Sequence, residues 1–134
     1  MKFKAPRYAK PLVWSEDLRK SCRDHVKDHG LKSLTGHTGS DGSSPSERIM
    51  RYLKDPTMTG ENLGYINENP LEVLIDFIIG YGDPDKRDRT NIFSKDWEMH
   101  GSFSGKHLKY NVMICQNFAA GSAKVNTSPV KAPR

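Results

Sequence analysis

Two histidines on one predicted helix have a spacing that allows both to bind a single metal ion. His25 and His29 stand four positions apart, so both imidazoles project from the same helical face. Val26, Lys27 and Asp28 lie between them, and the glutamate that zinc protease motifs place directly after the first histidine is missing. We therefore expect this pair to lie on a half-buried edge of the helix and not to form a metal centre.

A serine-rich loop offers the residue types of a hydrolase triad. Ser40, Ser43 and Ser44 lie close in sequence to His37 and Asp41. A nucleophilic serine of the α/β-hydrolase type sits in a G-x-S-x-G turn, and the sequence contains none. Ser44 is also well placed to cap the helix that follows it. We therefore expect no serine hydrolase activity.

The sequence has two cysteines, which are too few for a disulfide-stabilised scaffold. Cys22 and Cys115 are 93 positions apart, so a bond between them would close most of the chain into one loop. Spacing alone does not place two thiols within bonding distance. Two buried free thiols are the favoured interpretation, and a disulfide is the alternative.

Hydrophobic spacing, capping residues and prolines at the first helical position predict three helices. They span residues 15–29 with a stop at Gly30, residues 45 to about 55, and residues 70–79 with a stop at Gly80. The third helix is strongly apolar, so we expect it to be covered on more than one side. Residues 80–96 are charged and predicted to be mainly loop.

Three strands are predicted around and after these helices. A short strand is expected at residues 61–66, and residues 98–103 and 108–118 should form a hairpin with Gly105 in the link. In the last strand, apolar side chains alternate between the two faces. Helices that precede a closing hairpin indicate an α+β fold in which helices pack on a small antiparallel sheet.

Length and charge indicate one polar domain with basic ends. The chain has 134 residues and a formal net charge of +5, and the basic excess lies largely near the two termini. We expect an irregular basic lead over residues 1–11, which could be the start of a truncated domain, and a flexible tail over residues 120–134. The apolar run at residues 71–79 is too short to span a membrane. No signal peptide is visible, so the chain either is cytoplasmic or lacks the start of its gene.

Four segments in a fixed order resemble the CAP superfamily, the SCP-like domain of cysteine-rich secretory, antigen 5 and pathogenesis-related proteins. Residues 12–18 resemble the opening of its first helix, and residues 37–49 resemble the segment that carries its first cavity histidine. Gly60-Glu61-Asn62 matches the family's GEN motif, and residues 112–116 resemble its C-terminal signature. The likeness covers about residues 12–119 and is greatest to bacterial and protist members.

The resemblance implies an α-β-α sandwich that is secreted, with a cleft that holds two histidines and two glutamates able to bind a metal such as zinc. His37 matches the first histidine and Glu61 the first glutamate. Asp88 stands where the second histidine is usual, Arg89 matches an arginine beside the cavity, and the second glutamate falls near Gly80. We therefore expect a partly degraded cavity, because two ligands are fewer than a stable zinc site needs. In the other interpretation, His37 only hydrogen-bonds Glu61 and fixes the loop to the sheet.

These observations predict a non-enzymatic binding module for a lipid, a sterol or an extracellular protein partner, with no required cofactor and no specific nucleic-acid partner. One alternative is a metal-dependent hydrolase that uses His37 and Glu61, with Asp88 as an oxygen ligand. Another is a basic module that binds nucleic acid, which predicts steep salt dependence. The oligomeric state is left open.

Overall fold

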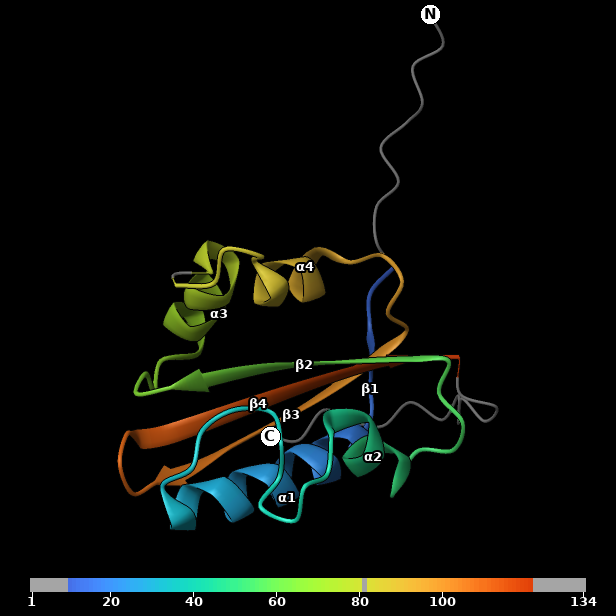
Figure 1. The fold of residues 1–134 in the computed structure, drawn as a ribbon. Coiled ribbons are helices and arrows are strands. Elements are labelled where there is room, and N and C mark those ends of the chain that lie inside the picture. Colours follow the sequence, from blue (N-terminus) through green and yellow to red (C-terminus); the bar gives the residue numbers. More distant parts are fainter. Residues whose placement is uncertain (1–9, 81, 122–134) are drawn as a thin grey trace, which may run out of the picture.

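A four-stranded sheet lies between two layers of helices (Figure 1). The computed structural model describes residues 10–80 and 82–121. The elements are β1 (Val13–Trp14), α1 (Glu16–Lys32), α2 (Pro45–Met50), β2 (Met58–Tyr65), α3 (Pro70–Ile79), α4 (Arg87–Phe93), β3 (Met99–His107) and β4 (Asn111–Ala120). Helices α1 and α2 lie on one side of the sheet, and α3 and α4 on the other (Figure 1). The predicted α+β class and α-β-α arrangement are confirmed.

The sheet is mixed, although the sequence analysis expected an antiparallel one. Its strand order is β1-β3-β4-β2, with β4 antiparallel to both β2 and β3 and with β1 parallel to β3. The sequence analysis did not predict β1, which has only two residues. The strand forms because the Val13 amide donates to the Glu98 carbonyl at 3.0 Å and the Ser15 amide to the His100 carbonyl at 2.7 Å. Ser15 then caps α1 through its side chain.

Helix α1 begins at the predicted cap but does not stop at Gly30. It continues to Lys32, and Ser33 ends it in the left-handed conformation with φ of 55°. Gly30 serves a different purpose: a Cβ atom built on it would lie 2.1 Å from the carbonyl oxygen of Lys106 in β3. The Leu108 amide donates to the Gly30 carbonyl at 2.9 Å. The glycine is therefore required by close contact between helix and hairpin, and the prediction of a helix stop was wrong.

Other helices and strands also differ from their predicted bounds. Helix α2 is shorter than predicted, and β2 begins three residues earlier, at Met58. The charged segment expected as loop contains α4. Gly105 lies within β3 and not in the hairpin link. The prediction that α3 is covered on more than one side was wrong, because only its Val73 and Phe77 are buried.

The core lies between α1 and the sheet. Cys22 and Val26 of α1 pack with Met113 and Cys115 of β4, and each of these side chains is 1% exposed or less. A second cluster joins Leu18 of α1 to α2 and the start of β3. No helix within residues 10–80 and 82–121 has the length and apolar character needed to cross a bilayer. Most of the lead and of the tail expected at the two ends lies outside the described residues, and β4 itself runs to Ala120.

Candidate functional site

The loop that carries His37 is held by side chains at three consecutive carbonyl groups. The His25 Nε2 lies 2.9 Å from the Gly36 carbonyl oxygen, and the His29 Nε2 lies 2.8 Å from that of Thr38. A carbonyl oxygen only accepts, so both imidazoles donate from Nε2. Arg48 donates from Nη2 to the His37 carbonyl at 2.6 Å. Three buried donors therefore fix the backbone on both sides of His37.

His25 and His29 are structural residues, and their expected place on a half-buried helix edge was wrong. They are 0% and 1% exposed, because the loop folds over them. Potential ligand atoms of His25, Asp28 and His29 lie within 4.8 Å of one another. The histidines donate to the loop from Nε2, and the Asp28 carboxylate accepts from Lys32 and from Ser40. The three residues thus hold the loop, and the buried Nδ1 atoms of both histidines remain without a hydrogen-bond partner.

Glu61 is a buried carboxylate with cationic and polar partners on both oxygens. Its side chain is 2% exposed. Arg48 donates from Nη1 to Oε2 at 2.8 Å and from Nη2 to Oε1 at 3.0 Å. His37 donates from Nδ1 to Oε1 at 2.9 Å, and the Cys115 thiol lies 3.4 Å from Oε2. The hydrogen bond between His37 and Glu61 joins the loop to β2, as the structural interpretation of the pair requires.

These partners keep Glu61 ionised. Burial alone would raise the pKa of this carboxyl group, but the hydrogen bond from His37 and the Arg48 guanidinium outweigh that effect and lower the pKa to about 2. Burial, together with the nearby positive charge of Arg48, lowers the pKa of His25 to about 4. At neutral pH the loop is therefore held by a neutral imidazole and by a fully charged pair of Arg48 and Glu61.

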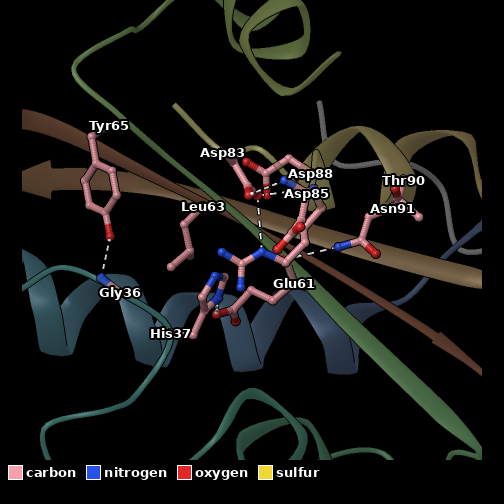
Figure 2. Close-up of a pocket in the computed structure, with 11 residues that line it drawn as sticks. Gly36, His37, Glu61, Leu63, Tyr65, Asp83, Asp85, Asp88, Thr90 and Asn91 are labelled. Carbon is pink, nitrogen blue, oxygen red and sulfur yellow. Dashed lines mark hydrogen bonds and ion pairs between the residues drawn. The ribbon is translucent and has the colours of Figure 1, made fainter. Parts of the chain in front are cut away.

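His37 and Glu61 face a common pocket at the edge of β2 (Figure 2). The pocket has a volume of about 620 Å³. One wall comes from the His37 loop and from side chains of β2, and the other from α4 and the segment that leads into it. The lining residues are Gly36, His37, Glu61, Leu63, Tyr65, Asp83, Asp85, Arg87, Asp88, Thr90 and Asn91. Four carboxylates, those of Glu61, Asp83, Asp85 and Asp88, line the pocket.

Asp88 lines the pocket opposite His37, and a network beneath it fixes its segment to β2. The buried Asn62 donates from Nδ2 to the Asp88 carbonyl at 3.1 Å and accepts from the Asn91 amide at 2.8 Å. Partial burial raises the pKa of the Asp88 carboxyl, an effect that the nearby His37 opposes. The structure thus places His37, Glu61 and Asp88 around one hollow.

Arg89 does not line this pocket. Its guanidinium donates to the carbonyl oxygens of Ile78 and Ile79 and so closes the C-terminal end of α3. In the charged segment before and within α4, Arg87 and Asp83 form a surface ion pair at 3.1 Å. The same segment supplies three of the carboxylates that line the pocket. Of these, the sequence analysis placed only Asp88 at the cavity and did not anticipate Asp83 and Asp85.

The residues around the pocket do not fit a structural zinc ion. Such an ion takes four donors, usually cysteine or histidine. Both oxygens of Glu61 are occupied by Arg48, so a cation at Glu61 would have to displace a guanidinium that is 3% exposed. His37, Asp83, Asp85 and Asp88 also line the pocket, but among the described residues three potential ligand atoms lie within 4.8 Å of one another only at His25, Asp28 and His29. The pocket therefore lacks a preformed set of donors, and the charge of Arg48 would repel a zinc ion.

Arg48 is the residue that the sequence analysis missed. It lies in α2 directly after the capping box and next to the core residue Ile49, at a position that could equally be a solvated helix surface. The available signal was indirect. A buried carboxylate must have a partner, and Glu61 had no cation near it in sequence.

The sequence matches the model of CAP, the cysteine-rich secretory protein family, over residues 4–118. The chain belongs to the CAP family. The sequence has no significant match among the curated proteins.

Two solved structures share the fold of this CAP domain. An outer surface protein from Borrelia burgdorferi is 18% identical, with a TM-score of 0.71, and the match covers 84% of this chain and 79% of that one. An extracellular protein containing a SCP domain from Bacillus anthracis is 17% identical, with a TM-score of 0.68 over 84% of this chain and 35% of that one. At these identities the likeness establishes the fold alone.

Proposed function

We propose that this CAP domain is a non-enzymatic binding module that acts outside the cell and takes a lipid or a sterol as its ligand. The observation that carries the non-enzymatic part is the pairing of Glu61 with Arg48 through both carboxylate oxygens. A general base needs a lone pair free to reach a substrate proton. Glu61 has none free, and its pKa of about 2 makes it a weak base.

An apolar groove under α3 supports a lipid or sterol ligand. It has a volume of about 540 Å³. Its apolar lining comes from Val73, Leu74 and Phe77 of α3 and from Phe103 and Ile114 of the sheet, and Glu68, Ser102, Ser104 and Gln116 add polar groups at its sides. Pockets of this size and character accommodate small apolar ligands. The groove is separate from the carboxylate-rich pocket, whose polar lining suits an aliphatic ligand poorly.

The two similar structures support a location outside the cell. One is an outer surface protein and the other an extracellular protein. Secreted binding domains meet lipids and sterols at cell surfaces. The extracellular assignment therefore agrees with the proposed ligand class.

Two alternative functions receive less support. A metal-dependent hydrolase that uses His37 and Glu61 would need Glu61 released from Arg48, and chelator-sensitive ester or peptide hydrolysis lost in His37→Ala would establish it. A nucleic-acid-binding module would need a basic face. Residues 10–121 carry 15 basic and 16 acidic residues, so the excess of positive charge lies in the terminal segments.

Binding measurements with a matched pair of variants test the groove. Purified protein is titrated with a fluorescent fatty acid and a fluorescent sterol, and with phosphatidylcholine vesicles with and without sterol. We expect saturable binding that weakens at least about tenfold in Leu74→Asp, because a carboxylate would enter the apolar lining. Leu71→Asp is the control, since Leu71 is exposed on the same helix and does not line the groove. Absence of binding to every probe, or equal loss in both variants, would refute the groove as the ligand site.

A further inference from the structure

The two cysteines of the chain meet in the interior of the domain. Cys22 on α1 and Cys115 on β4 are both 0% exposed and belong to one packed cluster. Both are free thiols in this structure. The Cys22 thiol lies 3.5 Å from the Gly101 carbonyl oxygen, and the Cys115 thiol lies 3.4 Å from Glu61 Oε2. The sequence analysis left their pairing open.

Glycines in β3 bring the helix unusually close to the sheet at this point. A Cβ atom on Gly101 would lie 2.4 Å from the Arg19 backbone nitrogen, and one on Gly105 would lie 3.0 Å from a Val26 methyl. A disulfide requires the two Cα atoms to lie about 4.4–6.8 Å apart, so close approach of helix and sheet favours one. Because Gly101 and Gly105 have no side chains, the distance between α1 and the sheet is short where Cys22 faces β3.

The electrostatics of the pair agree with direct proximity. Burial raises the pKa of the Cys115 thiol, and the neighbouring Cys22 thiol raises it further. Two thiols that are adjacent and buried are stable as they stand in a reducing compartment. In an oxidising compartment such a pair is a candidate for covalent linkage.

We propose that Cys22 and Cys115 form an intramolecular disulfide that joins α1 to β4 when the chain folds in an oxidising medium. The oxidant is a small-molecule disulfide such as oxidised glutathione. One cysteine thiolate attacks it, forms a mixed disulfide and releases one glutathione thiolate. The second cysteine thiolate attacks the protein sulfur of that mixed disulfide and releases the second glutathione. Two protein thiols and one glutathione disulfide thus become one protein disulfide and two glutathione thiols.

Exchange takes place during folding, because neither thiol is exposed in the native state. The bond would close a loop between positions 22 and 115, and long loops gain most from closure in the chain-entropy description. It would also remove the thiol that lies beside Glu61, and Arg48 and His37 would remain on that carboxylate. This inference concerns covalent stability and does not depend on the ligand of the groove.

Refolding of the wild-type chain tests the pairing. Reduced, denatured protein is refolded in a glutathione redox buffer, quenched in acid, denatured and alkylated. We expect no alkylated cysteine, a mass lower by two hydrogen atoms, and after proteolysis a linked peptide pair that contains Cys22 and Cys115. Reductant should then lower the urea concentration at the unfolding midpoint.

Cysteine variants serve as matched controls. Cys22→Ser and Cys115→Ser each retain one thiol and should show no such loss of mass, and reductant should not shift the midpoint of Cys22→Ala/Cys115→Ala. Three results on the wild-type chain would overturn the proposal: two alkylated thiols after refolding, glutathione adducts alone, or a linked form that unfolds at lower urea than the reduced form.

Discussion

Arg48 and Glu61 form a two-point ion pair inside the domain, with Nη1 to Oε2 at 2.8 Å and Nη2 to Oε1 at 3.0 Å. Their side chains are 3% and 2% exposed. The pair links α2 to β2, and the same guanidinium holds the carbonyl of His37. One buried cation thus both neutralises the carboxylate of the pocket and fixes the loop that faces it.

Loss of the cation should be far more costly than loss of a surface pair. We expect Arg48→Met to lower the free energy of unfolding by about 3–5 kcal/mol, because it leaves the Glu61 charge buried without its main partner. Arg51→Met is the control. It breaks an exposed pair with Asp41 and should cost at most about 1 kcal/mol. Urea unfolding of both variants measures the difference, and equal midpoints would show that the buried pair contributes no more than the exposed one.

Acid should destabilise the domain through His25. The pKa of this imidazole is lowered from 6.5 to about 4 in the folded protein, so the unfolded chain takes up its proton first as the pH falls. The stability due to the neutral ring is complete above pH 6.5 and is lost between pH 6.5 and 4, by about 3 kcal/mol in total. Urea unfolding at several pH values should show this loss in the wild type. His25→Gln keeps a donor for the Gly36 carbonyl and should lose less stability over that range; parallel pH profiles would contradict this prediction.

Gly30→Ala should destabilise the domain, whereas most replacements of a helical glycine by alanine stabilise a protein. Replacing an exposed glycine inside a helix by alanine typically raises the free energy of unfolding by about 1 kcal/mol. Here the added methyl group would meet the Lys106 carbonyl oxygen at 2.1 Å, and that contact is to backbone. We expect a net loss of at least about 2 kcal/mol in thermal or urea unfolding, because α1 must move away from the hairpin. A stabilised variant would show that the helix does not pack as described.

Asn62→Leu should loosen the segment that forms the acidic wall of the pocket. It removes the donor to the Asp88 carbonyl and the acceptor for Asn91, at a cost of about 1–3 kcal/mol. Limited proteolysis should find new cleavage between residues 82 and 96 while α1 and β4 stay intact. Asn67→Ala, at a more exposed position, is the control. Unchanged cleavage in Asn62→Leu would mean that other contacts hold the segment.

Local signals predicted the helices that have caps and prolines. Ser15, Ser44 and Asn69 cap α1, α2 and α3 through their side chains, because a cap depends only on residues within one turn. Gly30 misled the analysis because its requirement comes from Lys106, which is distant in sequence. The short strand β1 was likewise invisible, since only its pairing with β3 makes it a strand.

The sequence predicted which residues face the pocket better than it predicted their hydrogen-bond partners. Family motifs pointed to His37 and Glu61, which face one pocket together with Asp88. The roles of Arg48, His25 and His29 depend on contacts between a helix, a loop and a strand that no local pattern records. The family motif placed Arg89 beside the cavity, yet its side chain donates to the carbonyls at the end of α3.

Isothermal titration of the wild-type protein with zinc, repeated on His37→Ala, tests most directly whether the cavity has lost its capacity for a metal. The occupied oxygens of Glu61, and the lack of three closely spaced ligand atoms in this pocket among the described residues, predict no stoichiometric zinc binding that depends on His37. Tight binding of one zinc ion per chain that disappears in His37→Ala would contradict the account.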